Sequence, residues 1–190
     1  MKEITEAEKQ VKLVEKNPYN IKRIKNPTDE AILRAIDLRG LEVFTSFTKP
    51  MLKDSDLSED WQNLAVLMRP RDITFLYDPS EKVQVSACSK DFNALDGICN
   101  ATVSAKLAAI NALNNSEEFV EIHSRALDNL LSGEISDELQ DAIFHSDLMG
   151  DGKSVKKIVK TKRFFNSFNS KNQILLRNRY ADFYETTDED

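Results

Sequence analysis

Four of the five prolines in this 190-residue chain form two matched pairs. Pro18 and Pro27 make the first pair, and Pro70 and Pro79 repeat it 52 residues further along. Because proline lacks a backbone N–H, it suits the first turn of a helix and interrupts a helix elsewhere. The paired prolines therefore predict helix starts that recur, and they indicate an internal repeat, which constrains the fold more than composition does.

The repeat has a simple template, in which two apolar residues three positions apart precede a helix-capping residue. Asn or Asp, Pro, and Thr or Ser follow in the two best copies. The four copies begin at Ile21, Ile73, Leu95 and Leu127. The 52-residue gap has room for a degraded copy near residues 41–49 and a polar insertion at 53–60. We expect the helix N-caps at Asn26, Asp78, Asn100 and Ser132, since these types accept hydrogen bonds from free helix N–H groups.

Each unit is predicted to be a short helix, a tight turn and a longer helix. Pro27 and Pro79 would open the longer helices, and Ala35, Ala87 and Ala109 at equivalent places favour close helix approach. One such helix pair cannot bury its apolar face alone, whereas stacked pairs can. The expected fold is thus all-α, a short irregular α-solenoid of helix pairs (HEAT-like). Four unrelated capped helices in an irregular bundle are the alternative.

The composition is typical of a folded chain with a hydrophobic core and few glycine-dependent turns. The hydrophobic fraction is 41% and there are ten Phe, so the chain can bury a core. Only five glycines are present, which argues against a turn-rich β-sandwich and a glycine-built nucleotide fold.

The segments at 17–36 and 72–87 resemble a short helical repeat found in uncharacterised bacteriophage and bacterial proteins. The shared pattern is approximately I-x-x-I-x-N-P-S/T-E-x-V-x-x-x-A, and the similarity extends over residues 20–110. This resemblance implies a viral or bacterial cytoplasmic setting and a binding role more often than catalysis. The copies at Leu95 and Leu127 lack the proline.

Charge divides the chain into blocks. Net charge is −1 over residues 1–115, −8 over 116–149, +8 over 150–180 and −5 over 181–190. We expect a helical-repeat domain at 1–148 with an N-terminal capping helix over 3–16, a basic amphipathic helical segment at 149–181 and an acidic tail at 182–190. The opposite blocks could pair with each other, remain solvated, or form a surface for a partner.

The basic segment is the best functional candidate in the sequence. It could contact an acidic protein partner, bind nucleic-acid phosphates, or lie against residues 116–149. Lysine outnumbers arginine, so readout of base edges is not expected. The candidate partner-binding residues are Lys153, Lys156, Lys157, Lys160, Lys162, Arg163, Arg177 and Arg179.

No catalytic motif is complete. Gly150-Asp-Gly-Lys-Ser lacks the first glycine of a phosphate-binding loop, because residue 147 is Asp. Cys88 and Cys99 with His123 and His145 match no standard zinc spacing, and the two cysteines are expected to be free thiols, although a disulfide stays open. We therefore expect no enzyme activity, metal or cofactor.

The sequence as a whole predicts a non-enzymatic protein–protein interaction module. By analogy, it would be a phage-encoded inhibitor or regulator of a host or viral protein assembly. The alternatives are a nucleic-acid-binding accessory factor using residues 153–179 and, less expected, an enzyme. No secretory signal or membrane-spanning run is recognisable, so a cytoplasmic location is expected.

Overall fold

The computed structural model describes residues 4–46, 51–53, 55–116, 120–133, 135–149, 166 and 168–179. This part of the chain is mostly helical. It contains no β-strand apart from isolated bridge pairing such as that of Leu52 with Leu76. The expectation of an all-α fold is confirmed for the described residues.

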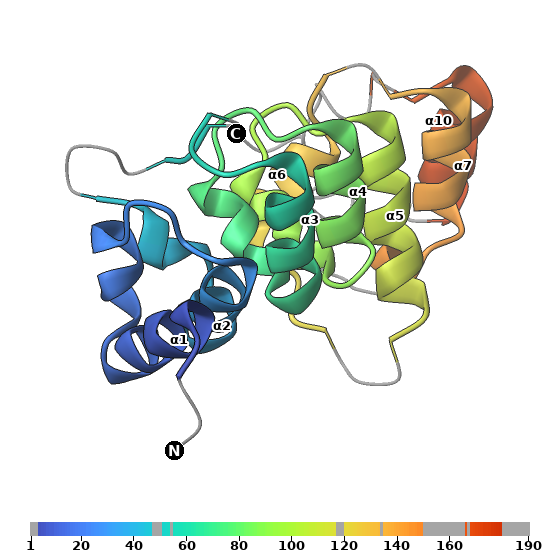
Figure 1. Ribbon diagram of the computed structural model, residues 1–190. Coiled ribbons are helices and arrows are strands. Elements are labelled where there is room, and N and C mark those ends of the chain that lie inside the picture. Colours follow the sequence, from blue (N-terminus) through green and yellow to red (C-terminus); the bar gives the residue numbers. More distant parts are fainter. Residues whose placement is uncertain are drawn as a thin grey trace, which may run out of the picture.

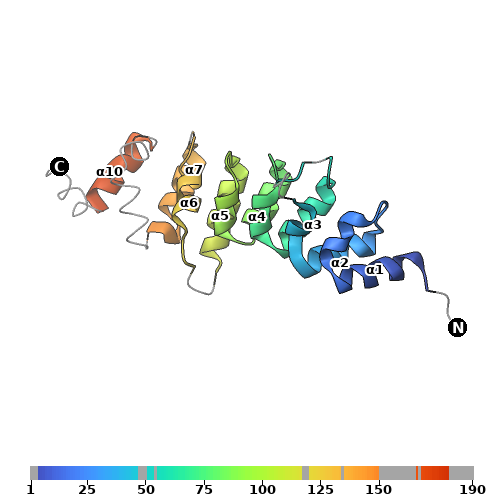
Figure 2. The same ribbon diagram turned by 90° about the vertical axis from the view of Figure 1, so that its left-hand side faces the viewer.

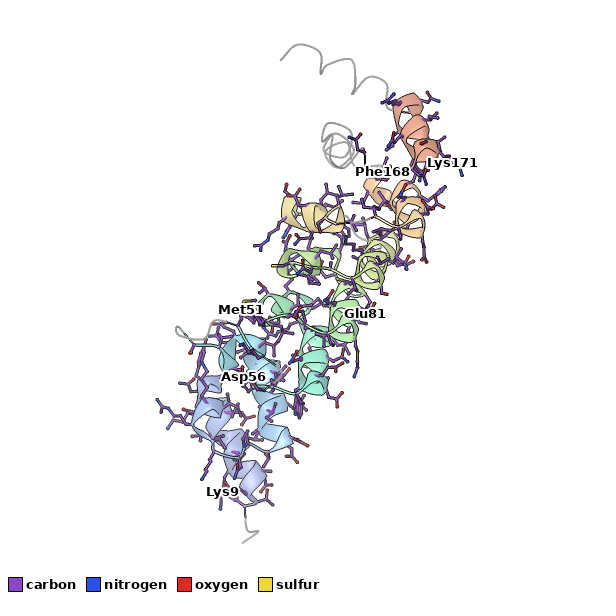
Figure 3. All side chains as sticks on the ribbon, turned by 90° about the horizontal axis from the view of Figure 1, so that it is seen from above. Lys9, Met51, Asp56, Glu81, Phe168 and Lys171 are labelled. Carbon is purple, nitrogen blue, oxygen red and sulfur yellow. The ribbon has the colours of Figure 1, made fainter. Side chains whose placement is uncertain are left out.

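The longer α-helices form one row, and the 3-10 helices with one shorter α-helix form a second row behind it (Figures 1 and 2). Figure 3 shows Glu81 on the α-helical side and Met51 on the other side. The first row comprises α1 (Glu6–Lys16), α2 (Asp29–Arg39), α3 (Glu59–Met68), α4 (Glu81–Cys88), α5 (Val103–Asn114), α7 (Asp137–Phe144) and α10 (Ser170–Arg179). The second comprises the 3-10 helices η1 (Pro18–Arg23), η2 (Gly40–Phe44), η3 (Pro70–Phe75) and η4 (Phe92–Gly97), followed by helix α6 (Ser124–Leu130). A further 3-10 turn, η5, spans Asp147–Met149.

The predicted unit of short helix, turn and longer helix is present in the structure. The short helix is a 3-10 helix in the units η1–α2, η3–α4 and η4–α5, and an α-helix in α6–α7. The first apolar residue of every copy is at most 3% exposed. The alanines at equivalent places are fully buried, so neighbouring α-helices approach closely there; they are Ala35, Ala87 and Ala109, with Ala65 of α3 at the same position.

The predicted N-caps were wrong, since the long helices begin later. The N-caps are Thr28, Ser80, Thr102 and Ser136, two or four residues beyond the expected ones. Ser80 Oγ accepts from the N–H of Val83, and Thr102 Oγ1 accepts from that of Ala105. Asp78 instead adopts a positive φ of 51°, which places it in the turn before the helix. Pro27 and Pro79 thus precede the cap and do not open the helix.

Buried glutamines connect successive α-helices. The side-chain oxygens of Gln10, Gln84 and Gln140 accept hydrogen bonds from the N–H groups of Thr28, Thr102 and Asn169 respectively. Each donor residue is the N-cap of the next helix or, for Asn169, the residue before α10. Because a helix leaves its first N–H groups without internal partners, these contacts satisfy buried donors and set the register between neighbouring helices.

The gap between the first two strong copies holds a further unit. Its parts are η2 and α3, and the N-cap of α3 is Ser58. Ser58, Ser80 and Thr102 therefore succeed one another at intervals of 22 residues. The stretch 53–60, expected to be an insertion, contributes the first turn of α3 from Glu59 onward.

The expected N-terminal helix is present, whereas most of the predicted C-terminal segment lies outside the described residues. The N-terminal helix is present as α1, which buries Val14 and Gln10, whereas Ile4 is exposed. Near the other end, helix α10 spans Ser170–Arg179. Residues 150–165, which carry most of the basic segment, and the acidic tail 182–190 lie outside the described residues.

Candidate functional site

A groove of about 530 Å³ opens between the ends of α4 and α5. We call it the α4–α5 groove. Its floor holds small side chains and its edges carry polar ones: Ser89, Lys90, Ala108, Asn111, Ala112, Asn115 and Ser116.

The groove arises because α5 is longer than α4. The two helices pack side by side (Figure 1). The side chain of Gln84 accepts from the N–H of Thr102 and so holds the N-cap of α5 level with the start of α4. Helix α4 has 8 residues and α5 has 12, so α5 extends about one turn beyond the end of α4. This extra turn carries Asn111 and ends beside Asn115, while Lys90 lies just past the end of α4.

Three polar side chains of the groove have no partner within the described chain. The carboxamides of Asn111 and Asn115 and the ammonium of Lys90 form no hydrogen bond or ion pair with any described residue, and all three residues are exposed. Other cations on the same row are paired, such as Lys82 with Asp60 at 3.2 Å. The unpaired groups are therefore available to a ligand.

An apolar shelf continues the same face on α3. Leu67 and Met68 are 39% and 41% exposed. They precede Ser89 and Lys90 by 22 residues, and Ser89 precedes Asn111 by the same interval. The helices α3, α4 and α5 lie side by side (Figure 2). In this register their shared face presents apolar, cationic and amide groups in succession.

A second polar cluster lies at the junction of η4 and α6. His123 Nδ1 lies 2.5 Å from Asp96 Oδ2, and the N–H of His123 donates to the buried Asn93 side chain at 2.9 Å. Asn93 also donates to the carbonyl of Glu121. These contacts secure the segment that enters α6, and His123 is the N-cap of that helix.

Two buried ionisable groups lie elsewhere in the core. Burial, with a smaller contribution from Asp91, raises the pKa of the Cys88 thiol to about 12, so this thiol is not a nucleophile near neutral pH. Burial lowers the pKa of Lys106, whose ammonium donates to the carbonyl of Ser132 at 2.6 Å. Cys88 and Cys99 are both free, which excludes a disulfide between them in this structure.

Most of the predicted partner-binding residues cannot be placed. Lys153, Lys156, Lys157, Lys160, Lys162 and Arg163 lie outside the described residues. Arg177 is exposed on α10, and Arg179 ends that helix. The use of residues 153–179 for a protein or for nucleic acid stays a prediction.

No residue of the α4–α5 groove was predicted from the sequence. One signal could have indicated it, because Ser89 and Asn111 occupy equivalent positions of successive 22-residue units where α3 has leucine. Only the unequal lengths of α4 and α5 turn these positions into a groove.

No family model, curated protein or solved structure matches the chain. Among the described residues, no group of three His, Cys, Asp or Glu side chains could hold a metal ion. None of the helices described is both long and apolar enough to cross a membrane.

Proposed function

We propose that this protein is a short α-solenoid that binds another protein through the exposed face of its α-helical row. The 22-residue register of α3, α4 and α5 and the glutamine contacts between helices support the solenoid. Stacked repeats of this kind present extended surfaces on which successive helices contribute equivalent positions.

The observation that carries the proposal is the α4–α5 groove beside its apolar shelf. Protein interfaces combine an apolar centre, in which methionine is enriched, with hydrogen-bonding groups around it. Leu67 and Met68 supply the first component, and Asn111, Asn115 and Lys90 supply the second. The assignment to bacteriophage, and to inhibition of a host assembly in the cytoplasm, stays a prediction.

The proposal is tested by affinity purification of the full chain from a bacterial lysate, the setting that the resemblance implies. We expect one protein to be recovered in stoichiometric amount. Ala112→Trp should abolish its recovery, because the indole would fill the groove from a half-buried position on its floor. Lys9→Trp, on exposed α1, is the control and should retain the partner.

Thermal melting of both variants checks that they are folded. Recovery of no stoichiometric protein by the wild-type chain would contradict the proposed function. Equal recovery by folded Ala112→Trp and by the control would instead place the binding surface away from the groove.

A further inference from the structure

The chemistry of the α4–α5 groove limits what can occupy it. A volume near 530 Å³ is in the range of ligand sites, yet such sites are lined mainly by large apolar and aromatic side chains. Here Ala108 and Ala112 form a shallow floor and the remaining lining groups are polar. The groove therefore suits a polar chain lying across a small-residue floor more than a compact apolar molecule.

The two carboxamides match the groups of a peptide main chain. Each offers an N–H donor and a carbonyl acceptor, the same pair that a peptide unit carries. Asn111 lies in the last turn of α5, and Asn115, the C-cap of that helix, follows four residues later, about 6 Å along the helix axis. Alternate residues of an extended chain are about 7 Å apart, so both carboxamides can reach successive outward-facing peptide groups of one strand-like segment.

Lys90 indicates which charge the bound segment should carry. Among the described residues that line the groove, Lys90 is the only charged one, and its ammonium has no ion pair with a described residue. A carboxylate that bound there would not displace an existing partner, whereas a second cation would be repelled.

We propose that the α4–α5 groove binds an extended, acidic peptide segment of a partner protein. Asn111 and Asn115 hydrogen-bond its main chain, and Lys90 pairs with an Asp or Glu side chain. This inference rests on the proposed function and names the partner chemistry of the same site.

The experiment selects a random 12-residue peptide display library against the full chain. Recovered peptides are synthesised, and their affinities are measured by fluorescence polarisation. We expect Asp and Glu to be enriched at one position. Lys90→Glu and the double variant Asn111→Ala/Asn115→Ala should each weaken binding about tenfold, the former more strongly at low salt. Lys16→Glu on α1 is the matched control and should bind as the wild type does.

A charge swap makes the test specific. Replacing the enriched acidic residue of the peptide by Lys should abolish binding to the wild type and restore binding to Lys90→Glu. Recovery of no peptide, absence of acidic enrichment, or unchanged affinity of Lys90→Glu would each overturn the inference. The proposed function would survive these results if the full chain still retained a stoichiometric protein in the affinity purification, so the two failures are distinguishable.

Discussion

The side-chain oxygen of Gln84 accepts a hydrogen bond from the backbone N–H of Thr102 at 3.0 Å. The same carboxamide donates to the carbonyl of Pro79 at 2.9 Å. One buried side chain thus joins the turn before α4 to the N-cap of α5, and it sets the level at which the two helices start.

Replacing Gln84 by Leu should lower the free energy of unfolding by about 3 kcal/mol, because the partly buried N–H of Thr102 and the buried carbonyl of Pro79 would lose their partner. Urea denaturation measures the loss. Gln173→Leu is the matched control at the same repeat position of α10, where the half-buried side chain donates to the carbonyl of Phe168, and its cost should be about 1 kcal/mol. Equal losses for the two variants would contradict the linking role.

Gly40→Ala should destabilise the protein much more than Gly133→Ala. Both glycines have a φ near +70°, where a side chain is strained by about 1 kcal/mol. A Cβ on Gly40 would clash with Asp72 Oδ2, which accepts from the N–H of Leu41, whereas a Cβ on Gly133 would meet open space. We expect losses of about 3 and about 1 kcal/mol in urea denaturation. Similar losses would show that Asp72 can move away without cost.

Lys106 should make the free energy of unfolding depend on pH in the alkaline range. Burial puts the folded-state pKa of Lys106 below the unfolded value of 10.5. At pH values between these two pKa values, the folded chain therefore binds fewer protons than the unfolded chain. The free energy of unfolding therefore rises with pH across that window and levels off above 10.5. Urea denaturation from pH 7 to 10 should show this rise in the wild type and a smaller one in Lys106→Gln. Lys16→Gln, on exposed α1, is the control and should keep the full rise.

The two cysteines should differ in reactivity. Cys99 is exposed, whereas Cys88 is fully buried with its pKa raised to about 12. At pH 8, a disulfide reagent such as dithiobis(nitrobenzoate) should modify the thiol of Cys99 rapidly and that of Cys88 only after denaturation. Cys99→Ser should remove the rapid phase. Two equally fast thiols in the native wild type would indicate that the end of α4 opens readily.

The repeat and the all-α class could be predicted because they depend on local features. Proline and capping residues mark helix ends within a few positions, and Ile21, Ile73, Leu95 and Leu127 recur where each unit needs a buried residue. The exact caps could not be predicted from the same features. Asn26 and Thr28 are both good caps, and the choice of Thr28 is accompanied by a bond from its N–H to Gln10, eighteen residues earlier in the chain.

The α4–α5 groove could not be predicted from the sequence, because it exists only once the helices pack together. Helix ends are the feature that a sequence places least sharply, and the groove results from a difference of one turn between α4 and α5. Ser89, Lys90 and Asn111 look like ordinary surface residues in the sequence. They become one site only because Gln84 aligns the two helices at their starts.

The sequence by itself determined that this chain forms recurring capped helices with buried apolar positions, since those preferences act over a few neighbouring residues. The tertiary structure alone decided which polar groups remain unpaired and where they gather. That outcome follows from the packing of one unit on the next. The neighbouring helix supplies the hydrogen-bond partners of a buried polar side chain, and its length decides which helix end remains exposed.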